Sequence, residues 1–241
     1  MIVILTDFGD AEYTGVMKGV IYSINESSRI ADLYNFVDPQ NIREAAWILY
    51  KNYRHFPRNS VFLCVVDPGV GSERQCLAVK TKNYFFVGPD NGLMQKAAAE
   101  DGILEAVELQ TKNASMTFHG RDVFAKAAAM IEKGKEIKSL GKKTSMKTKL
   151  DFHLKGRQGE VVRIDNFGNV ITNLSHLDKN SYKVKAGNFI QRLSFYRTYE
   201  SAPPGKLILT NGGYDTLEIS MKNSSAYKKL RLKIGDRIEI S

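Results

Sequence analysis

The sequence has few of the residues that metal sites, disulfide frameworks and membrane spans require. Among its 241 residues are two cysteines and four histidines, and Cys64 and Cys76 do not have the spacing of a zinc or iron–sulfur site. Cys64 lies in an apolar run, so we expect a buried, reduced thiol and a reducing compartment. No run of about 18 apolar residues is present to form a transmembrane helix. We therefore expect a cytoplasmic protein without a catalytic metal.

Phosphate-binding loops are also missing. The chain contains neither G-x-G-x-x-G nor G-x-x-x-x-G-K-[ST], so a phosphate group is not the obvious ligand. A net charge of +9 can indicate nucleic-acid binding. The basic excess is concentrated between Lys133 and Lys149, and this segment has none of the aromatic side chains on which single strands stack. We interpret it as a solvated surface and do not expect nucleic acid as a partner.

Strand-like and helix-like patterns alternate in the first 150 residues. Ile2–Leu5 is typical of a short strand, and Tyr13–Ile24 and Ile42–Tyr53 repeat apolar residues at helical spacing. Val61–Val66 is a continuous apolar run, typical of a parallel strand that is buried on both faces. The alternation predicts a layered α/β domain with a mostly parallel sheet over residues 1–150.

The remaining residues, 151–241, have a different pattern. A segment rich in lysine, glycine and threonine runs from about Leu140 through Gly159 and is typical of a linker. Beyond it, short strand-like segments alternate with turn residues, and no long helical pattern is present. We expect a smaller, all-β, barrel-like domain.

Several polar motifs follow expected strands. Asp7 follows the first strand, and Asp67 follows the apolar run, with Arg74 seven positions later. Ligands of open α/β sheets bind beyond the carboxyl ends of the strands. Asp7 is therefore suited to accept hydrogen bonds from ribose hydroxyls. Asp67 and Arg74 are suited to bind a small polar reactant together. Each motif alone is equally compatible with an ordinary turn or a surface ion pair.

A further motif, Thr117-Phe118-His119-Gly120-Arg121-Asp122, precedes an alanine-rich helical run over Val123–Lys133. Asp122 is suited to cap or charge the first turn of that helix. His119 would then lie near the positive end of the helix, which favours the neutral imidazole and suits a general base. A helix start with a solvated histidine is the alternative.

The motifs together are more specific than any one of them. They occur in this order: Leu5-Thr6-Asp7-Phe8-Gly9, Val66-Asp67-Pro68-Gly69-Val70-Gly71, Val87-Gly88-Pro89-Asp90-Asn91-Gly92, the His119 motif, and Asp165-Asn166-Phe167-Gly168-Asn169. From Ile2 to about Ile240 the chain resembles the S-adenosyl-L-methionine hydroxide adenosyltransferase family, which is related to fluorinating and chlorinating enzymes that use the same substrate.

The resemblance implies a reaction and an assembly. The reaction splits S-adenosyl-L-methionine into adenosine and L-methionine by attack of water-derived hydroxide on the ribose C5′, without a cofactor. The assembly is a homotrimer, whose active site lies between the N-terminal domain of one subunit and the C-terminal domain of the next.

The resemblance also implies roles for individual residues. The catalytic residues would be Asp67, Arg74 and His119, and the substrate-binding residues would be Asp7, Phe118, Asp165, Phe167 and Asn169. Halogenating relatives carry Tyr in place of His119, which favours hydroxide over halide. They also hold the methionine carboxylate with a Ser-Arg pair that Asn211-Gly212-Gly213-Tyr214 lacks. Halide transfer and a non-catalytic adenosine or S-adenosylmethionine sensor are the alternatives.

Metal independence is the first testable expectation. Because the sequence lacks a metal-ligand cluster, protein treated with a chelator and then dialysed should split S-adenosyl-L-methionine as fast as untreated protein. Loss of the rate on chelation, with recovery on adding zinc or magnesium, would contradict it.

Overall fold

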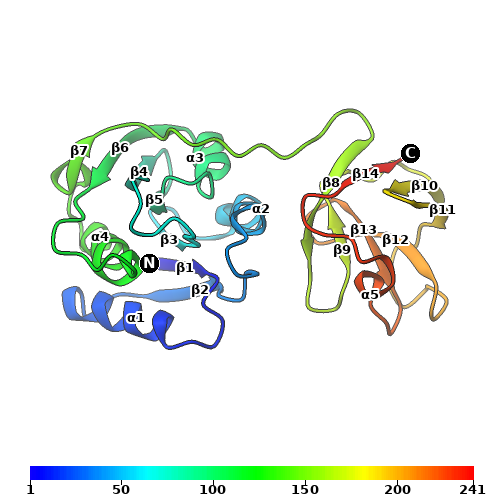
Figure 1. Cartoon of the computed structure of the whole chain (residues 1–241), viewed down its shortest axis with the longest axis horizontal. Helices are drawn as coiled ribbons and strands as arrows, with labels where there is room; N and C mark the ends of the chain where they lie inside the picture. Colours follow the sequence, from blue (N-terminus) through cyan, green and yellow to red (C-terminus); the bar gives the residue numbers. More distant parts are fainter. The chain divides into compact units, whose positions relative to one another are not determined.

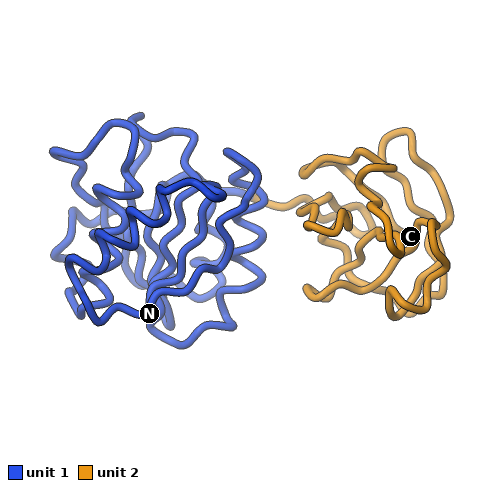
Figure 2. The backbone as a smooth tube through the Cα atoms, turned by 90° about the horizontal axis from the view of Figure 1, so that it is seen from below, with its two compact units in different colours: residues 1–150 blue, residues 151–241 orange.

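The chain folds into two units, each built on its own set of strands. The computed structural model describes all 241 residues. It divides into two compact units, Met1–Leu150 and Asp151–Ser241 (Figure 2). None of its helices combines the length and the apolar character needed to cross a membrane.

The first unit is built on a seven-stranded sheet with the order β2-β1-β3-β5-β4-β6-β7 (Figure 1). The strands are β1 (Ile2–Thr6), β2 (Ile30–Tyr34), β3 (Val61–Val65), β4 (Cys76–Thr81), β5 (Phe85–Pro89), β6 (Ile103–Leu109) and β7 (Gly141–Lys143). Strand β1 pairs in parallel with β2 and β3, and β3 pairs in parallel with β5. The other pairs are antiparallel, so the α/β fold class is confirmed and the sheet is mixed. A parallel pairing of β4 with β5 is not available, because a crossover needs about a dozen residues and only residues 82–84 join these strands.

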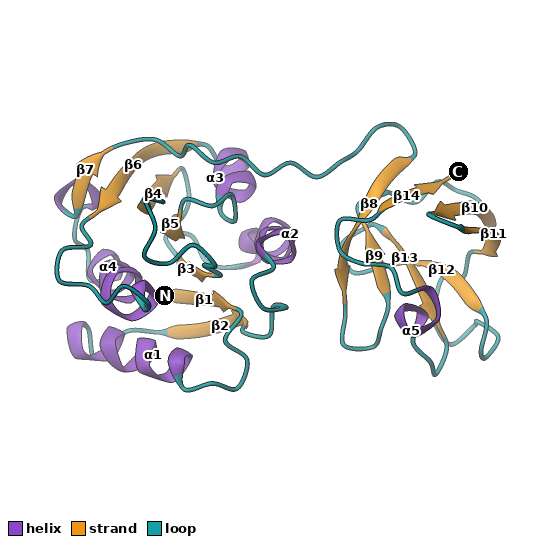
Figure 3. Cartoon of the chain, viewed as in Figure 1, coloured by secondary structure: helices purple, strands orange, loops and turns teal.

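Helices cover both faces of this sheet (Figure 3). They are α1 (Tyr13–Ile24), α2 (Ile42–Asn52), α3 (Gln95–Asp101) and α4 (Ala125–Glu132), with 3-10 turns at Tyr53–His55 and Ile137–Ser139. Strand β1 alternates between the two cores, as a pleated strand must. Ile2 and Ile4 pack in the core that includes α1 and α4, whereas Val3 and Leu5 pack in the core that includes α2 and α3.

The helix after His119 begins differently from the expectation. A π-helical turn, Gly120–Phe124, precedes α4, and His119 is its N-cap residue. Asp122 does not cap the helix, but it is the acidic residue of its first turn, which confirms the other half of the prediction. Its carboxylate accepts hydrogen bonds from Arg121 Nε at 2.8 Å and from the backbone N–H of Ser115 at 2.9 Å, and the pairing with Arg121 lowers the pKa of Asp122 to about 2.

The second unit is an antiparallel, nearly closed barrel with the strand order β11-β10-β14-β8-β9-β13-β12. Its elements are β8 (Gln158–Ile164), β9 (Val170–Thr172), β10 (Ser181–Ala186), β11 (Phe189–Ser194), β12 (Leu207–Asn211), β13 (Leu217–Met221), β14 (Arg237–Ile240) and the short helix α5 (Ala226–Leu230). A bridge between Phe195, next to β11, and Leu209 of β12 joins the two edges. Tyr182, Leu209 and Ile219 lie in the core, and the expected barrel-like domain is confirmed.

The backbone conformation of Gly71 and its close contact with Met116 predict how the loop between β3 and β4 responds to substitution. Its φ is +79°, and an added Cβ would lie 2.5 Å from the carbonyl oxygen of Met116. Gly134 also has a positive φ, +96°, but its Cβ would meet no atom within 4 Å. Gly134→Ala should therefore lower the free energy of unfolding by about 1 kcal/mol through backbone strain alone. Gly71→Ala should lower it by roughly 2–4 kcal/mol. Equal losses in urea denaturation would show that the contact with Met116 is not a constraint.

Candidate active site

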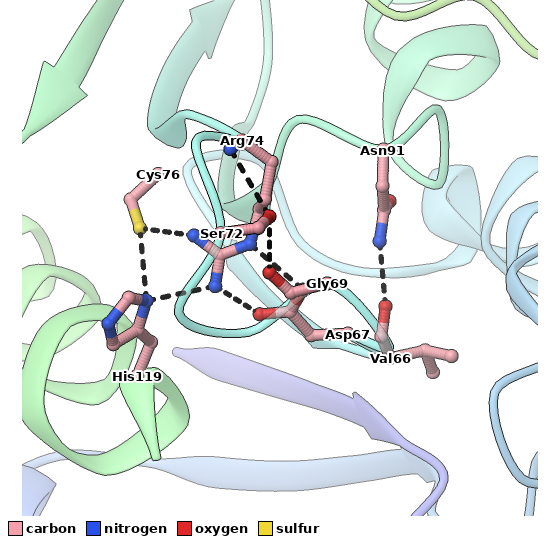
Figure 4. Close-up of polar contacts among 8 residues, drawn as sticks. All are labelled: Val66, Asp67, Gly69, Ser72, Arg74, Cys76, Asn91 and His119. Carbon is pink, nitrogen blue, oxygen red and sulfur yellow. Dashed lines mark hydrogen bonds and ion pairs between the residues drawn. The ribbon is translucent and has the colours of Figure 1, made fainter. Parts of the chain in front are cut away.

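The loop between β3 and β4 turns back on itself and brings Arg74 to Asp67 (Figure 4). Asp67 lies just beyond the carboxyl end of β3. The backbone N–H of Val70 donates to the carbonyl of Asp67 at 3.2 Å, and the N–H and hydroxyl of Ser72 donate to the carbonyl of Gly69 at 3.1 and 2.7 Å. These local hydrogen bonds fold the loop back, so that Arg74 lies beside the carboxyl end of β3.

Asp67 and Arg74 form a two-pronged ion pair. Arg74 Nε donates to Asp67 Oδ1 at 2.9 Å, and Arg74 Nη2 donates to Asp67 Oδ2. The side chains are 7% and 10% exposed, respectively, so solvent screens the pair weakly. Burial acts against the charge of Arg74, but the hydrogen bonds and the charge of Asp67 outweigh it and raise the pKa of Arg74. The guanidinium therefore stays a cation whose orientation the carboxylate sets.

His119 joins this pair through one ring nitrogen. Its Nδ1 lies 2.9 Å from Arg74 Nη2. An arginine has donors and no acceptor, so Nδ1 must accept, and the neutral ring carries its hydrogen on Nε2. The side chain of His119 is buried, with 5% exposure. The structure thus brings Asp67, Arg74 and His119 together and assigns the Nε2–H tautomer.

The pKa of His119 lies below its ordinary value. Burial is the main cause, because it disfavours the charged ring, and the cation of Arg74 adds to it. The carboxylates of Asp67 and Asp122 act in the opposite direction but do not prevail. The sequence left this direction open, and the geometry indicates a neutral imidazole at neutral pH.

A cavity of about 640 Å³ opens beside the network. Asp7, Asp67, Phe118 and His119 line it, and its volume suits a ligand of nucleoside size. Arg74 does not line it. Arg74 borders a smaller cavity of about 200 Å³, together with Cys76, Glu108 and, again, His119. Asp67 and His119 are therefore placed to touch a ligand, whereas Arg74 lies behind them.

An aromatic cluster forms the apolar wall of the larger cavity. Phe8, Tyr13 and Phe118 contact one another edge-to-face, with ring centroids 5.2–6.0 Å apart, and all three line the cavity. Asp7 lies at the same cavity, and its Oδ2 accepts a hydrogen bond from the backbone N–H of Gln40 at 2.8 Å. We did not single out Phe8 and Tyr13 from the sequence, although Phe8 adjoins Asp7.

The remaining expected residues lie in the second unit, at a cavity of about 540 Å³. The two carboxylate oxygens of Asp165 accept from the backbone and the side-chain amide of Asn169, both at 2.9 Å. Phe167, at the tip of this turn, is 80% exposed. Tyr199 also lines the cavity and donates to the buried carboxyl of Glu218. No sequence signal points to Tyr199, because it lies in no recognisable motif.

The expected site residues therefore fall into two sets, one in each unit. In the first set, Asp7, Asp67, Phe118 and His119 line the cavity of about 640 Å³, and Arg74 borders the smaller cavity of about 200 Å³ beside it. The second set, Asp165, Phe167 and Asn169, surrounds the cavity of the second unit. No group of three or more His, Cys, Asp or Glu side chains is arranged to hold a metal ion.

Known proteins resemble the chain over its whole length. Residues 2–141 match the model of the SAM hydroxide adenosyltransferase N-terminal domain, and residues 159–239 match that of its C-terminal domain. Proteins named (R)-S-adenosyl-L-methionine hydrolase from Thermus thermophilus and Methanocaldococcus jannaschii are 34% and 35% identical. The alignments cover 96% and 100% of this chain, respectively, and 95% of each relative.

A solved structure supports the same relationship. An uncharacterized conserved protein from Thermotoga maritima superposes with a TM-score of 0.93 at 35% identity, with full coverage of both chains. A fluorinase from Nocardia brasiliensis is more distant, at 24% identity over 70% of this chain and 69% of its own length.

Arg74→Met should raise the pKa of His119. The change removes the cation that disfavours the imidazolium and leaves the Asp67 carboxylate unpaired beside it. The shift is measured by an NMR titration of the His119 ring. Arg54→Met is the control, because Arg54 pairs with Glu100 at the surface and its loss should leave His119 unchanged. An unaltered titration in Arg74→Met would remove Arg74 from the electrostatics of His119.

Proposed function

The chain belongs to the SAM hydroxide adenosyltransferase family, and from this premise we propose that it hydrolyses S-adenosyl-L-methionine to adenosine and L-methionine. The observation that carries the proposal is the network of Asp67, Arg74 and His119 on the edge of a cavity of nucleoside size. The names of the relatives specify the (R) epimer at sulfur, so the two epimers are separate candidate substrates.

The sulfonium determines what the protein has to supply. Methionine leaves as a neutral thioether, so no acid is needed to expel it. The water oxygen bonds to C5′, the C5′–S bond breaks with its electron pair going to sulfur, and one proton is released. Water is a weak nucleophile, so holding it in line with C5′ and sulfur is the main task. Good positioning contributes roughly 7–11 kcal/mol to the lowering of such a barrier.

Asp67 and His119 are the residues that position the water in this mechanism, because both line the cavity. The Nε2–H of neutral His119 donates to the water oxygen, and a carboxylate oxygen of Asp67 accepts one of its hydrogens. As the oxygen bonds to carbon it becomes strongly acidic, so even a carboxylate paired with Arg74 can take the proton. His119 serves as the base only after its hydrogen moves to Nδ1, which requires Arg74 to release that nitrogen.

Arg74 acts through its two neighbours, because it borders the smaller cavity and not the larger one. It holds both oxygens of Asp67 and the Nδ1 of His119. These contacts require the planar, forked guanidinium of arginine. In Arg74→Lys the charge is kept, but the single ammonium group cannot hold Asp67 and His119 in the same way, so the rate should fall.

The remaining contacts define the substrate site. Asp7 binds the ribose hydroxyls, Phe118 contacts the sulfonium or the adenine, and Asp165, Phe167 and Asn169 contact the methionine and adenine groups. The two sets lie in different units, so we propose a homotrimer in which the first unit of one subunit and the second unit of the next form each site. The substrate is a small molecule, no metal or cofactor takes part, and the two unpaired cysteines suit a cytoplasmic location.

Halide transfer to C5′ is the alternative that the fluorinase relatives suggest. It is tested by incubation with S-adenosyl-L-methionine and chloride or fluoride, followed by a search for a 5′-halo-adenosine. A sensor would bind the substrate without turnover. Adenosine and methionine formed in equal amounts, at a rate independent of halide, are the expected result. Tight binding with no product would reject hydrolysis.

The rate should fall as pH decreases through a single titration below about 6.5, the ordinary pKa of histidine. The rate falls toward low pH because the neutral ring of His119, whose pKa is lowered, is the active form. Protonation puts a hydrogen on Nδ1, which then faces the N–H donor of Arg74. His119→Asn places an amide oxygen near the Nδ1 position and cannot titrate, so its acid limb should disappear. His119→Ala should lower kcat by about 10² or more. A His119→Ala enzyme that keeps the parental rate at every pH would exclude His119 from the reaction.

A shared site can be tested with mixed subunits. His119→Ala and Asp165→Ala change different units of the chain, so each variant should be inactive alone. After dissociation and reassembly together, some sites should combine two intact halves and recover part of the rate. Mixtures of two His119→Ala preparations with different tags serve as the control. If exchange is verified by the tags and every mixture stays inactive, the two sets of residues belong to one subunit.

A further inference from the structure

Arg74 has a third polar neighbour besides Asp67 and His119. Its Nη1 lies 2.9 Å from Cys76 Sγ, and the same sulfur lies 3.6 Å from His119 Nδ1 (Figure 4). Cys76 is the first residue of β4, where its backbone is opposite Pro89 of β5, and its side chain is buried. A central strand of the sheet therefore places this thiol against both the guanidinium and the imidazole.

A neutral thiol can satisfy both neighbours at once. Its sulfur accepts from an N–H, and its S–H donates to a nitrogen lone pair. Burial raises the pKa of Cys76, and the cation of Arg74 opposes the rise without cancelling it, so the S–H is retained at neutral pH. Arg74 Nη1 can therefore donate to the sulfur, while the S–H is a second and weaker donor, at 3.6 Å, to the Nδ1 lone pair of His119 that already accepts from Arg74 Nη2.

We propose that Cys76 is a positioning residue of the Asp67–Arg74–His119 network, in which its sulfur fixes the orientation of the guanidinium and its S–H supports the Nε2–H tautomer of His119. Cys76 borders the smaller cavity and not the larger one, so it acts through Arg74 and His119. The consequence for catalysis rests on the proposed hydrolysis, whereas the consequence for His119 does not.

The other cysteine, Cys64, has only a packing role. Cys64, in β3, lies in the apolar core that includes α2 and α3, and burial alone raises its pKa. The thiol of Cys76 differs because two polar groups face it. The charged groups that act on His119 are Arg74, Asp67 and Asp122, and Glu108 acts on Cys76. These four groups stay unchanged when either cysteine is replaced, which makes Cys64 a matched control.

The first measurement is an NMR titration of the His119 ring, which needs no turnover. Cys76→Ala removes a donor that only the neutral ring accepts, so the pKa of His119 should rise. Cys76→Ser keeps a donor and an acceptor and should restore the parental pKa. Cys64→Ala should leave it unchanged. Unaltered titration in Cys76→Ala would overturn the proposal, as would equal shifts in Cys76→Ala and Cys64→Ala.

The second measurement is steady-state kinetics with S-adenosyl-L-methionine. Cys76→Ala should lower kcat about tenfold, the scale of a lost hydrogen bond to a charged group, while KM changes less than about twofold and the acid limb moves to higher pH. Cys76→Ser should recover most of kcat. A loss that Ser does not rescue, with an unmoved pH profile, would assign Cys76 to packing. If the parental protein itself shows no turnover, hydrolysis fails while the titration still decides the role of Cys76.

Discussion

The candidate site depends on one buried interaction, the two-pronged ion pair between Asp67 and Arg74. Breaking a buried pair by removing one partner typically costs about 3–5 kcal/mol, because the other charge is left uncompensated. Both partners come from a single loop, and the glycines and the hydroxyl of that loop let it fold back on itself. The pair then extends to His119, so one local fold controls the orientation of three side chains from two distant parts of the sequence. Asp67 and His119 line the ligand cavity, and Arg74 contacts both of them from the side of the smaller cavity.

Much of this arrangement could be predicted from the sequence, since it depends on local signals. The apolar run Val61–Val66 indicates a buried strand, and polar motifs after strands mark where ligands bind. Periodicity also predicted α1, α2 and the all-β second unit. Some local signals were missed: Gly187-Asn188 between two strand-like segments is a hairpin signal, and it joins β10 to β11, which we did not predict.

Other features could not be predicted because they depend on tertiary contacts. The approach of Cys76 to His119 joins positions 43 residues apart, and no local pattern encodes it. The direction of the His119 pKa shift depends on burial and on three charges, the cation of Arg74 against the carboxylates of Asp67 and Asp122, whose distances a sequence does not give. The π turn at Gly120–Phe124 was not predicted, and Asp122 lies in the first turn without capping it, with its carboxylate bonded to Arg121 and Ser115. The position of Arg74 behind the site, and not on its wall, likewise depends on where the loop between β3 and β4 lies relative to His119 and the cavity.

The central claim is that water attacks C5′ of the substrate at the cavity of Asp67 and His119. The most direct measurement is mass spectrometry of the products formed in water enriched in ¹⁸O. One ¹⁸O atom is expected in the 5′-hydroxyl of adenosine and none in methionine, and His119→Ala should form the same labelled adenosine about 10² times more slowly, or more slowly still. Label in the amino-acid product, or unlabelled adenosine formed by the parental protein, would contradict attack of water at C5′.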